Sequence, residues 1–213
     1  MHSSFNEQRG FTIIEMIVSL GVFSIVITIA VGALLMLVAT NQRLQTEQSV
    51  MTNLSFALDS MTREIRTGTH YYCDSSGSVN GIFASSYNLD TLGNSYRDCT
   101  NGRGNNQIHG IAFNEGGDSI SGSNSRILYY FNQNDGKIYR RVGTSVEEPI
   151  TSTGIFIRDM YFYVAGSKPL SAGNPDYKDQ ASVTIFIEAA ESSNPADDSY
   201  YLQTTVTQRT LDL

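Results

Sequence analysis

Residues 8–21, Gln-Arg-Gly-Phe-Thr-Ile-Ile-Glu-Met-Ile-Val-Ser-Leu-Gly, place one acidic residue, Glu15, at the head of an uncharged apolar run. No further charge occurs before Arg43. As a helix, residues 16–39 would be about 36 Å long, enough to cross a bilayer core of about 30 Å. The many Ile and Val residues favour a strand in water, but in lipid only a helix satisfies its own backbone groups. The stretch therefore predicts a membrane-spanning helix.

Glu15 needs a positive partner, because a carboxylate in the membrane costs on the order of a few kcal/mol. A cut between Gly10 and Phe11 would create an α-amine at the start of the helix, roughly 6 Å of helical rise from Glu15. A buried amine and a buried carboxylate offset each other's desolvation only when they are paired. Each could also be matched by a neighbouring copy of the helix, which would select staggered copies.

Residues 9–15, Arg-Gly-Phe-Thr-Ile-Ile-Glu, resemble the prepilin cleavage site of type IV pilins and type II secretion pseudopilins. The resemblance implies that residues 1–10 are a leader and that a prepilin peptidase cuts after Gly10. It also implies that Phe11 becomes the N-methylated first residue. For Glu15 it implies the assembly role of the family's glutamate, which neutralises the amine of an adjacent subunit and is commonly missing from the tip-most subunit.

Two other interpretations of the apolar run are weaker. A secretory signal peptide has an apolar region of about 7 to 15 residues, much shorter than this one. An ordinary single-pass anchor explains the hydrophobicity but neither the Gly-Phe junction nor Glu15. A stripe of small residues at helical spacing either packs against another helix or occurs by chance, and the sequence leaves this open; its members are Gly21, Ser24, Thr28 and Gly32.

The helix is predicted to continue beyond the membrane. Apolar residues follow at alternating spacings of three and four, as on one face of a helix packed on a soluble core: Met51, Leu54, Leu58, Met61 and Ile65. We expect a membrane or filament-core half at 11–41, an amphipathic half at 42–68, and a left-handed cap at Gly68.

Residues 69–213 are rich in Ser, Gly, Asn, Tyr and Thr and predict a β-rich globular domain. The expected strands are 108–113, 126–132, 137–142, 155–164, 183–188 and 200–207. The fold class is therefore α+β and pilin-like, with one long N-terminal helix packed on a C-terminal antiparallel β domain. Residues 53–73 and 202–209 resemble the larger minor family members, the W-type minor pilins and J-type minor pseudopilins.

The only two cysteines are Cys73 and Cys99, and we predict a disulfide because the domain should lie outside the cytoplasm. The alternative is two free buried thiols. Their spacing fits neither a redox motif nor a zinc site. Two long loops, at 74–106 and 166–180, indicate either a surface function or disorder, and the bridge would tie down the first.

Catalysis is not expected, because the three histidines, His2, His70 and His109, stand in no recognised catalytic motif. Residues 102–107 begin like a phosphate loop but lack its third glycine. Several acidic residues in turn-rich stretches could hold calcium, although solvated turns are favoured: Asp135, Asp176, Asp179, Asp197 and Asp198. We expect no cofactor and no metal.

The chain has 14 basic and 21 acidic residues and a formal net charge of −7, which argues against direct nucleic-acid binding. One basic cluster stands out in the hairpin at 126–142, formed by Arg126, Lys137, Arg140 and Arg141 beside three tyrosines. It could contact nucleic acid or an acidic partner, but a solvated hairpin face is the favoured interpretation.

Two functions from different classes follow. In the first, the chain is a minor pilin or pseudopilin of a type IV pilus, secretion or DNA-uptake filament. Its partners would be prepilin peptidase, other pilin subunits, the inner-membrane assembly platform and, before assembly, membrane lipid. Its helix would span the inner membrane once, with the C-terminal domain outside the cytoplasm, until it enters a filament in the periplasm or at the cell surface. In the second, the chain is a permanently anchored extracytoplasmic ligand-binding protein.

Overall fold

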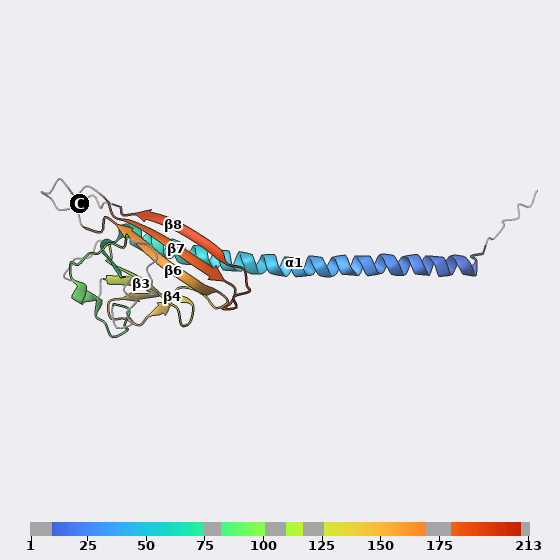
Figure 1. The fold of residues 1–213 in the computed structure, drawn as a ribbon, viewed down its shortest axis with the longest axis horizontal. Helices are drawn as coiled ribbons and strands as arrows, with labels where there is room; N and C mark the ends of the chain where they lie inside the picture. Colours follow the sequence, from blue (N-terminus) through green and yellow to red (C-terminus); the bar gives the residue numbers. More distant parts are fainter. Residues whose placement is uncertain (1–9, 75–81, 101–109, 117–125, 169–179, 210–213) are drawn as a thin grey trace, which may run out of the picture. The chain divides into compact units, whose positions relative to one another are not determined.

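The computed structural model describes residues 10–74, 82–100, 110–116, 126–168 and 180–209. The chain divides into two compact units, Met1–Thr46 and Glu47–Leu213. The long helix α1 (Ile13–Thr67) supplies residues to both units (Figure 1). The other elements belong to the second unit and are β1 (Thr69–Asp74), the short 3-10 helix η1 (Leu89–Leu92), β2 (Gly110–Asn114), β3 (Arg126–Asn132), β4 (Lys137–Val142), β5 (Glu148–Pro149), β6 (Phe156–Ala165), β7 (Ser182–Ala190) and β8 (Tyr200–Thr207).

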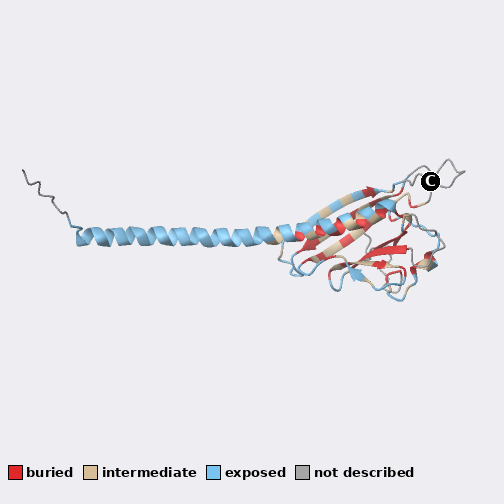
Figure 2. Cartoon of the chain, turned by 180° about the vertical axis from the view of Figure 1, so that it is seen from behind, coloured by how far each residue is buried: buried red, intermediate tan, exposed pale blue. Residues whose placement is uncertain are grey.

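In the first unit, every described residue of α1 before Thr46 is exposed, as the uninterrupted pale blue of this stretch in Figure 2 shows. By length and composition, α1 is the one helix among the described residues that could cross a membrane. Its apolar side chains find no cover within their own unit. The predicted apolar helix is confirmed, and an exposed apolar surface of this extent is typical of a stretch that contacts a membrane or other proteins.

In the second unit, α1 buries one stripe of side chains in the domain core: Val50, Leu54, Ala57, Leu58, Met61 and Ile65. These side chains pack with residues of both β-sheets. Met51, which the spacing placed in the stripe, is 41 % exposed, and its neighbour Val50 is buried instead. The α+β layout predicted from the sequence is confirmed.

The end of α1 differs from the prediction. Gly68 follows the last helical residue and donates its N–H to the carbonyls of Glu64 and Ile65, at 3.0 and 3.1 Å. It does not have the positive φ of a left-handed cap, because the first residue with a positive φ is His70, at 54°. Gly68 is instead required by close packing, since an added Cβ would lie 2.4 Å from Cδ2 of Phe113.

The strands of the predicted antiparallel β domain form two sheets, ordered β1-β2-β3-β4-β5 and β6-β7-β8. The first sheet ends at the two-residue strand β5, whose Pro149 has no N–H to donate to a further strand. The chain then starts a new sheet at Phe156, and Ile157 is tied to the β3–β4 turn by its N–H, which donates to the Gly136 carbonyl at 2.8 Å.

The first sheet is covered on both faces, so β2 and most of β3 are buried throughout. Ile111, Phe113 and Tyr129 face the main core with α1. Ala112, Leu128 and Tyr130 face a smaller core cluster, completed by Ile82, Phe83, Leu89 and Leu92. The segment 82–92, part of the long loop noted in the sequence, therefore packs as a lid on the sheet.

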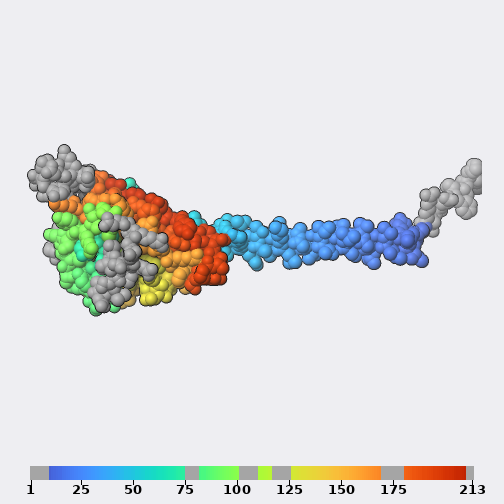
Figure 3. Space-filling view, in the orientation of Figure 1, coloured from blue at the N-terminus to red at the C-terminus, as the bar shows by residue number. Residues whose placement is uncertain are grey.

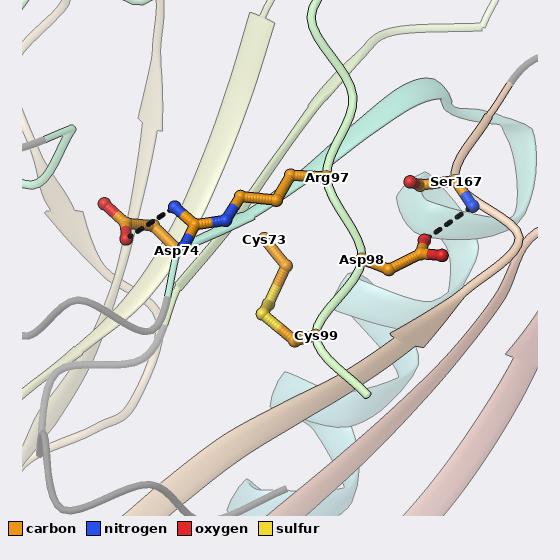
Figure 4. The surroundings of a disulfide bond; sticks show 6 residues. All are labelled: Cys73, Asp74, Arg97, Asp98, Cys99 and Ser167. Atoms are coloured by element: carbon orange, nitrogen blue, oxygen red, sulfur yellow. Dashed lines mark hydrogen bonds and ion pairs between the residues drawn. A yellow bond between two sulfur atoms is a disulfide. The ribbon is translucent and has the colours of Figure 1, made fainter. Parts of the chain in front are cut away.

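The predicted disulfide is confirmed. Cys73 of β1 bonds to Cys99, and their Cα atoms lie 5.8 Å apart (Figure 4). The segment 97–99, which we call the seam, pairs with strands of both sheets. Cys73 N donates to the Arg97 carbonyl at 3.0 Å, and Cys99 and Val164 exchange two backbone hydrogen bonds, each of 3.0 Å. The bridge therefore fastens β1 of the first sheet to a segment that holds β6 of the second.

Candidate functional site

The N-terminal end of α1 contains the three residues predicted for processing and assembly, Gly10, Phe11 and Glu15. Thr12 caps the helix: its carbonyl accepts hydrogen bonds from the N–H groups of Glu15 and Met16, at 3.1 and 3.3 Å. Its hydroxyl Oγ1 also accepts from Glu15 N, at 3.4 Å. A threonine followed three residues later by glutamate is the spacing of a capping box, a signal that the sequence analysis did not use.

Glu15 lies in the first turn of α1. The free N–H groups of a helix start create a partial positive charge there, which favours a carboxylate. This favourable field acts on Glu15 within its own chain, before any neighbouring amine is present. The carboxylate therefore lies at the positive end of the helix.

Gly10 and Phe11 precede the helix and are open to other molecules. No heavy atom lies within 4 Å of a Cβ added to Gly10, and Phe11 is 78 % exposed. Neither residue belongs to a helix or strand. A peptidase needs an accessible peptide bond in non-helical chain, and the Gly10–Phe11 bond meets this requirement. The use of this bond as a cleavage site stays a prediction.

The hydroxyls of the small-residue stripe are satisfied within α1. Ser24 Oγ donates to the Leu20 carbonyl and Thr28 Oγ1 to the Ser24 carbonyl, each at 2.8 Å. Such bonds to the preceding turn let a hydroxyl lie in an apolar environment without an outside partner. The stripe can therefore face lipid or another helix equally well, and its role stays open.

The basic cluster predicted for the hairpin is not a surface cluster. Arg126 and Arg141 are only 2 % and 1 % exposed. For these two residues, the interpretation as a solvated hairpin face and the interpretation as a partner-binding surface are both wrong. Arg126 donates to the carbonyls of Gly93 and Ser95, at 2.6 and 3.2 Å, and burial lowers its pKa. A buried guanidinium group must find hydrogen-bond acceptors. Arg126 finds them in the loop segment 82–95 and thereby holds this segment against the first sheet.

Arg141 has the same structural function. It donates to the carbonyls of Ile82 and Ala84, at 2.8 and 2.6 Å. It also forms an ion pair with Glu147, at 3.1 Å. These bonds anchor the segment that covers the outer face of the first sheet.

Arg140 and Tyr129 converge on Glu64 of α1. Arg140 Nη2 lies 3.0 Å from Glu64 Oε1, and its Nε donates to Oε2 at 3.0 Å. Tyr129 donates its hydroxyl to the same Oε2 at 2.7 Å, and burial together with this bond raises its pKa. Local sequence patterns could not predict this cluster, which we call the Glu64 node, because Tyr129 and Arg140 lie 65 and 76 residues from Glu64. It orients the second-unit part of α1 on the first sheet.

The acidic residues proposed for calcium are only partly described. Asp135 accepts hydrogen bonds from Lys137 N, at 3.2 Å, and from the Tyr139 hydroxyl, which raises the pKa of Tyr139 to about 12. Asp197 accepts from Ser192 Oγ at 2.5 Å. Within the described ranges, no three His, Cys, Asp or Glu side chains gather as metal ligands would. Asp198 lies within the described residues, whereas the candidates at 176 and 179, the loop at 102–107, and the histidines at 2 and 109 lie outside them.

Comparison with known proteins gives one match. A protein-family model, the prokaryotic N-terminal methylation motif, matches residues 5–31. This range contains Gly10, Phe11, Glu15 and most of the uncharged apolar run. No curated protein and no solved structure matches the chain.

Proposed function

We propose that this chain, which carries the type IV pilin-like prepilin motif, is a minor pilin or pseudopilin that is cut after Gly10 and built into a filament. The motif indicates a prepilin-processed protein, and proteins with it are structural subunits rather than enzymes. The observation that carries the proposal is the fully exposed apolar stretch of α1 behind Glu15.

That stretch has two environments available to it. Before assembly, lipid would cover its side chains, because the stretch is long and apolar enough to span a bilayer. In a filament, the same side chains would pack against the corresponding helices of neighbouring subunits. The transfer replaces lipid contacts by protein contacts, so shape and charge pairing, rather than hydrophobicity alone, must favour the filament.

Glu15 and the new amine of Phe11 would supply the charge pairing. An isolated carboxylate or ammonium in an apolar environment is costly, and a pair costs much less. The amine of one subunit beside Glu15 of the next would therefore fix the axial stagger between neighbours. In this proposal prepilin peptidase creates the amine, and an inner-membrane assembly platform moves the subunit into the filament.

Intact-mass measurement of the protein purified from its native membrane tests the proposal. We expect a mature chain that begins at Phe11 and carries one added methyl group on its α-amine. A chain that keeps residues 1–10 would contradict the proposal and favour the permanently anchored ligand-binding protein. Quantifying the chain against the other subunits of purified filaments then tests the minor role, which requires it to be the rarer component.

A further inference from the structure

A groove on the second unit lies between the last turns of α1 and the outer edge of β8. These two elements run beside each other in Figure 1 and Figure 2, and β8 reaches the surface in red in Figure 3. The groove has a volume of about 940 Å³. We call it the edge groove, and the residues that line it include Asp59, Arg63, Arg66, Thr205, Thr207 and Arg209.

The backbone of β8 presents unpaired hydrogen-bonding groups to the edge groove. β8 is the last strand of its sheet, and among the described residues no strand pairs with its outer edge. Gln208 N donates to the Ala181 carbonyl on the β7 side, and Arg209 N donates to the Arg66 carbonyl of α1, each at 2.8 Å. Successive N–H groups of a strand point to opposite edges. The N–H of Thr207, and that of every second residue before it, therefore faces the groove.

β8 lacks the features that usually protect the edge of a sheet. Its eight residues, Tyr-Tyr-Leu-Gln-Thr-Thr-Val-Thr, include no charge and no proline, and its pairing with β7 runs without a bulge. Natural edge strands are commonly protected by lysine, proline, bulges or short length. Most residues of β8 are β-branched or aromatic, which favours strand pairing. The outer edge of β8 is therefore suited to accept a further strand.

The edge groove is positively charged, although the chain as a whole has a net charge of −7. Its described lining contains three arginines, Arg63, Arg66 and Arg209, and one carboxylate, Asp59. Asp59 forms an ion pair with Arg63, at 3.0 Å, within α1. Arg66 and Arg209 are exposed. The lining thus has an excess of positive charge beside a row of backbone groups that face outward.

We propose that the edge groove binds an extended, acidic segment of another protein, which joins the second sheet as a further strand beside β8. Main-chain hydrogen bonds to the outer edge would hold the segment, and carboxylates on every second residue would lie near the arginines. A second copy is disfavoured as the occupant, because pairing two β8 edges would bring the arginines of both copies together. This site does not depend on entry into a filament.

Fluorescence anisotropy of a labelled, capped peptide, Thr-Glu-Thr-Glu-Thr-Glu-Thr, tests the proposal, with the full-length chain in non-ionic detergent micelles. Two further peptides separate the contributions of backbone and charge. The same sequence with a methyl group on every backbone nitrogen cannot donate to β8, and we expect at least about tenfold weaker binding. The sequence with Gln in place of each Glu keeps the backbone but loses the charge, and we again expect about tenfold weaker binding.

Variants of the chain test the same two contributions. Thr207→Pro removes an N–H from the outer edge and should weaken binding at least about tenfold, while the sheet still folds because this N–H does not bond to β7. Thr207→Val keeps the N–H and is the matched control. Arg66→Gln should weaken binding about fivefold. Lys137→Gln removes one positive charge from β4 of the first sheet and should weaken binding less than about twofold.

Three results would overturn the proposal. The first is equally tight binding of the methylated and unmethylated peptides, which would mean that no strand is added to the sheet. The second is equal weakening by Arg66→Gln and Lys137→Gln, which would mean that the peptide senses only net charge. The third is self-association of the chain that Thr207→Pro abolishes while peptide binding is unchanged, which would make a second copy the occupant.

Discussion

The two stretches of α1 are built from the same secondary structure for different surroundings. Before Thr46, every described residue is exposed and the apolar side chains point in all directions around the helix. From Glu47 onward, only one stripe is buried, which includes Leu54 and Met61, and the other faces are mainly polar, with Met51 and Phe56 as exposed apolar residues. A helix with apolar side chains on all faces needs cover on all faces, whereas a helix with one apolar stripe needs a single core.

The two stretches of α1 obtain their stability from different sources. The second stretch is stabilised by its own domain, through the core stripe and through the Glu64 node with Arg140 and Tyr129. In our proposal, the first stretch is stabilised by its surroundings, first by lipid and later by neighbouring subunits. Changes in the first stretch should therefore alter assembly, and changes in the second should alter folding.

Glu15→Ala should have the largest effect and should act on assembly only. Without the carboxylate, a neighbouring amine would remain unpaired in the filament core, and we expect incorporation to fall by at least about tenfold. The measurement is the amount of the chain in purified filaments relative to the membrane. Asp59→Ala is the control, because Asp59 is an exposed residue of the second stretch whose pair with Arg63, at 3.0 Å, adds little. If the Glu15 variant incorporates normally, the pairing argument fails.

Removing the disulfide should give the next largest effect and should act only on the second unit. The double variant, Cys73→Ala with Cys99→Ala, lacks the covalent link between two residues that are 26 positions apart in the sequence. Its free energy of unfolding should be lower by about 3.5 kcal/mol. Denaturant unfolding of the full-length chain in micelles, followed by tyrosine fluorescence, measures this loss. A reducing agent should destabilise the natural chain similarly and leave the double variant unchanged. An equal response of both proteins to the reductant would contradict this explanation.

Matched leucine truncations test the comparison directly. Leu54→Ala removes a fully buried side chain from the second stretch and should lower the free energy of unfolding by about 3 kcal/mol. Leu34→Ala makes the same change in the first stretch, where the side chain is 60 % exposed, and should leave the unfolding of the domain unchanged. A similar loss of stability from both variants would show that the two stretches do not differ as argued.

The smallest expected effect concerns the pH dependence of the second unit. Burial, reinforced by the charge of Arg126, lowers the pKa of His70 below 6.5, and its Nδ1 is buried without a partner among the described residues. The unfolded chain then binds a proton more readily, so stability falls as pH drops through about 6.5 toward the lower folded pKa. His70→Asn should reduce this loss by less than about 1 kcal/mol, since His70 is only half-buried.

Asparagine suits this test because it tolerates a positive φ, and the φ of His70 is 54°. Melting temperatures at about pH 7 and about pH 5 give the comparison. An unchanged difference between the two pH values in the variant would remove His70 as a contributor.

Local patterns predicted the elements whose structure depends on neighbours in the sequence. The apolar run and the spacing of three and four predicted α1 to within two residues of its observed start, Ile13. The hairpin of β3 and β4 was found at its observed bounds, because Gly136 takes the positive φ of 64° that such a turn requires. The bridge between Cys73 and Cys99 followed from the expected compartment.

The remaining features depend on contacts that are distant in the sequence. Arg126 and Arg141 looked like surface charges because the carbonyls that satisfy them lie at residues 82–95, far along the chain. The strand β1 was missed because its residues include a bulge and the left-handed His70, which interrupt the alternation. The division of the strands into two sheets, and the seam that joins β1 to β6, depend on pairings between residues far apart in the chain.

The seam also sets an order of events during biosynthesis. A ribosome makes both cysteines well before it makes Val164, so oxidation of the pair can be complete while the second sheet is still missing. Residues 97–99 would then stand ready as a template with free backbone groups, and β6 would dock onto them when it emerges. Because the disulfide would already fix residues 97–99 beside β1, β6 would pair with an ordered segment, and the two sheets would not have to find each other while both are unfolded.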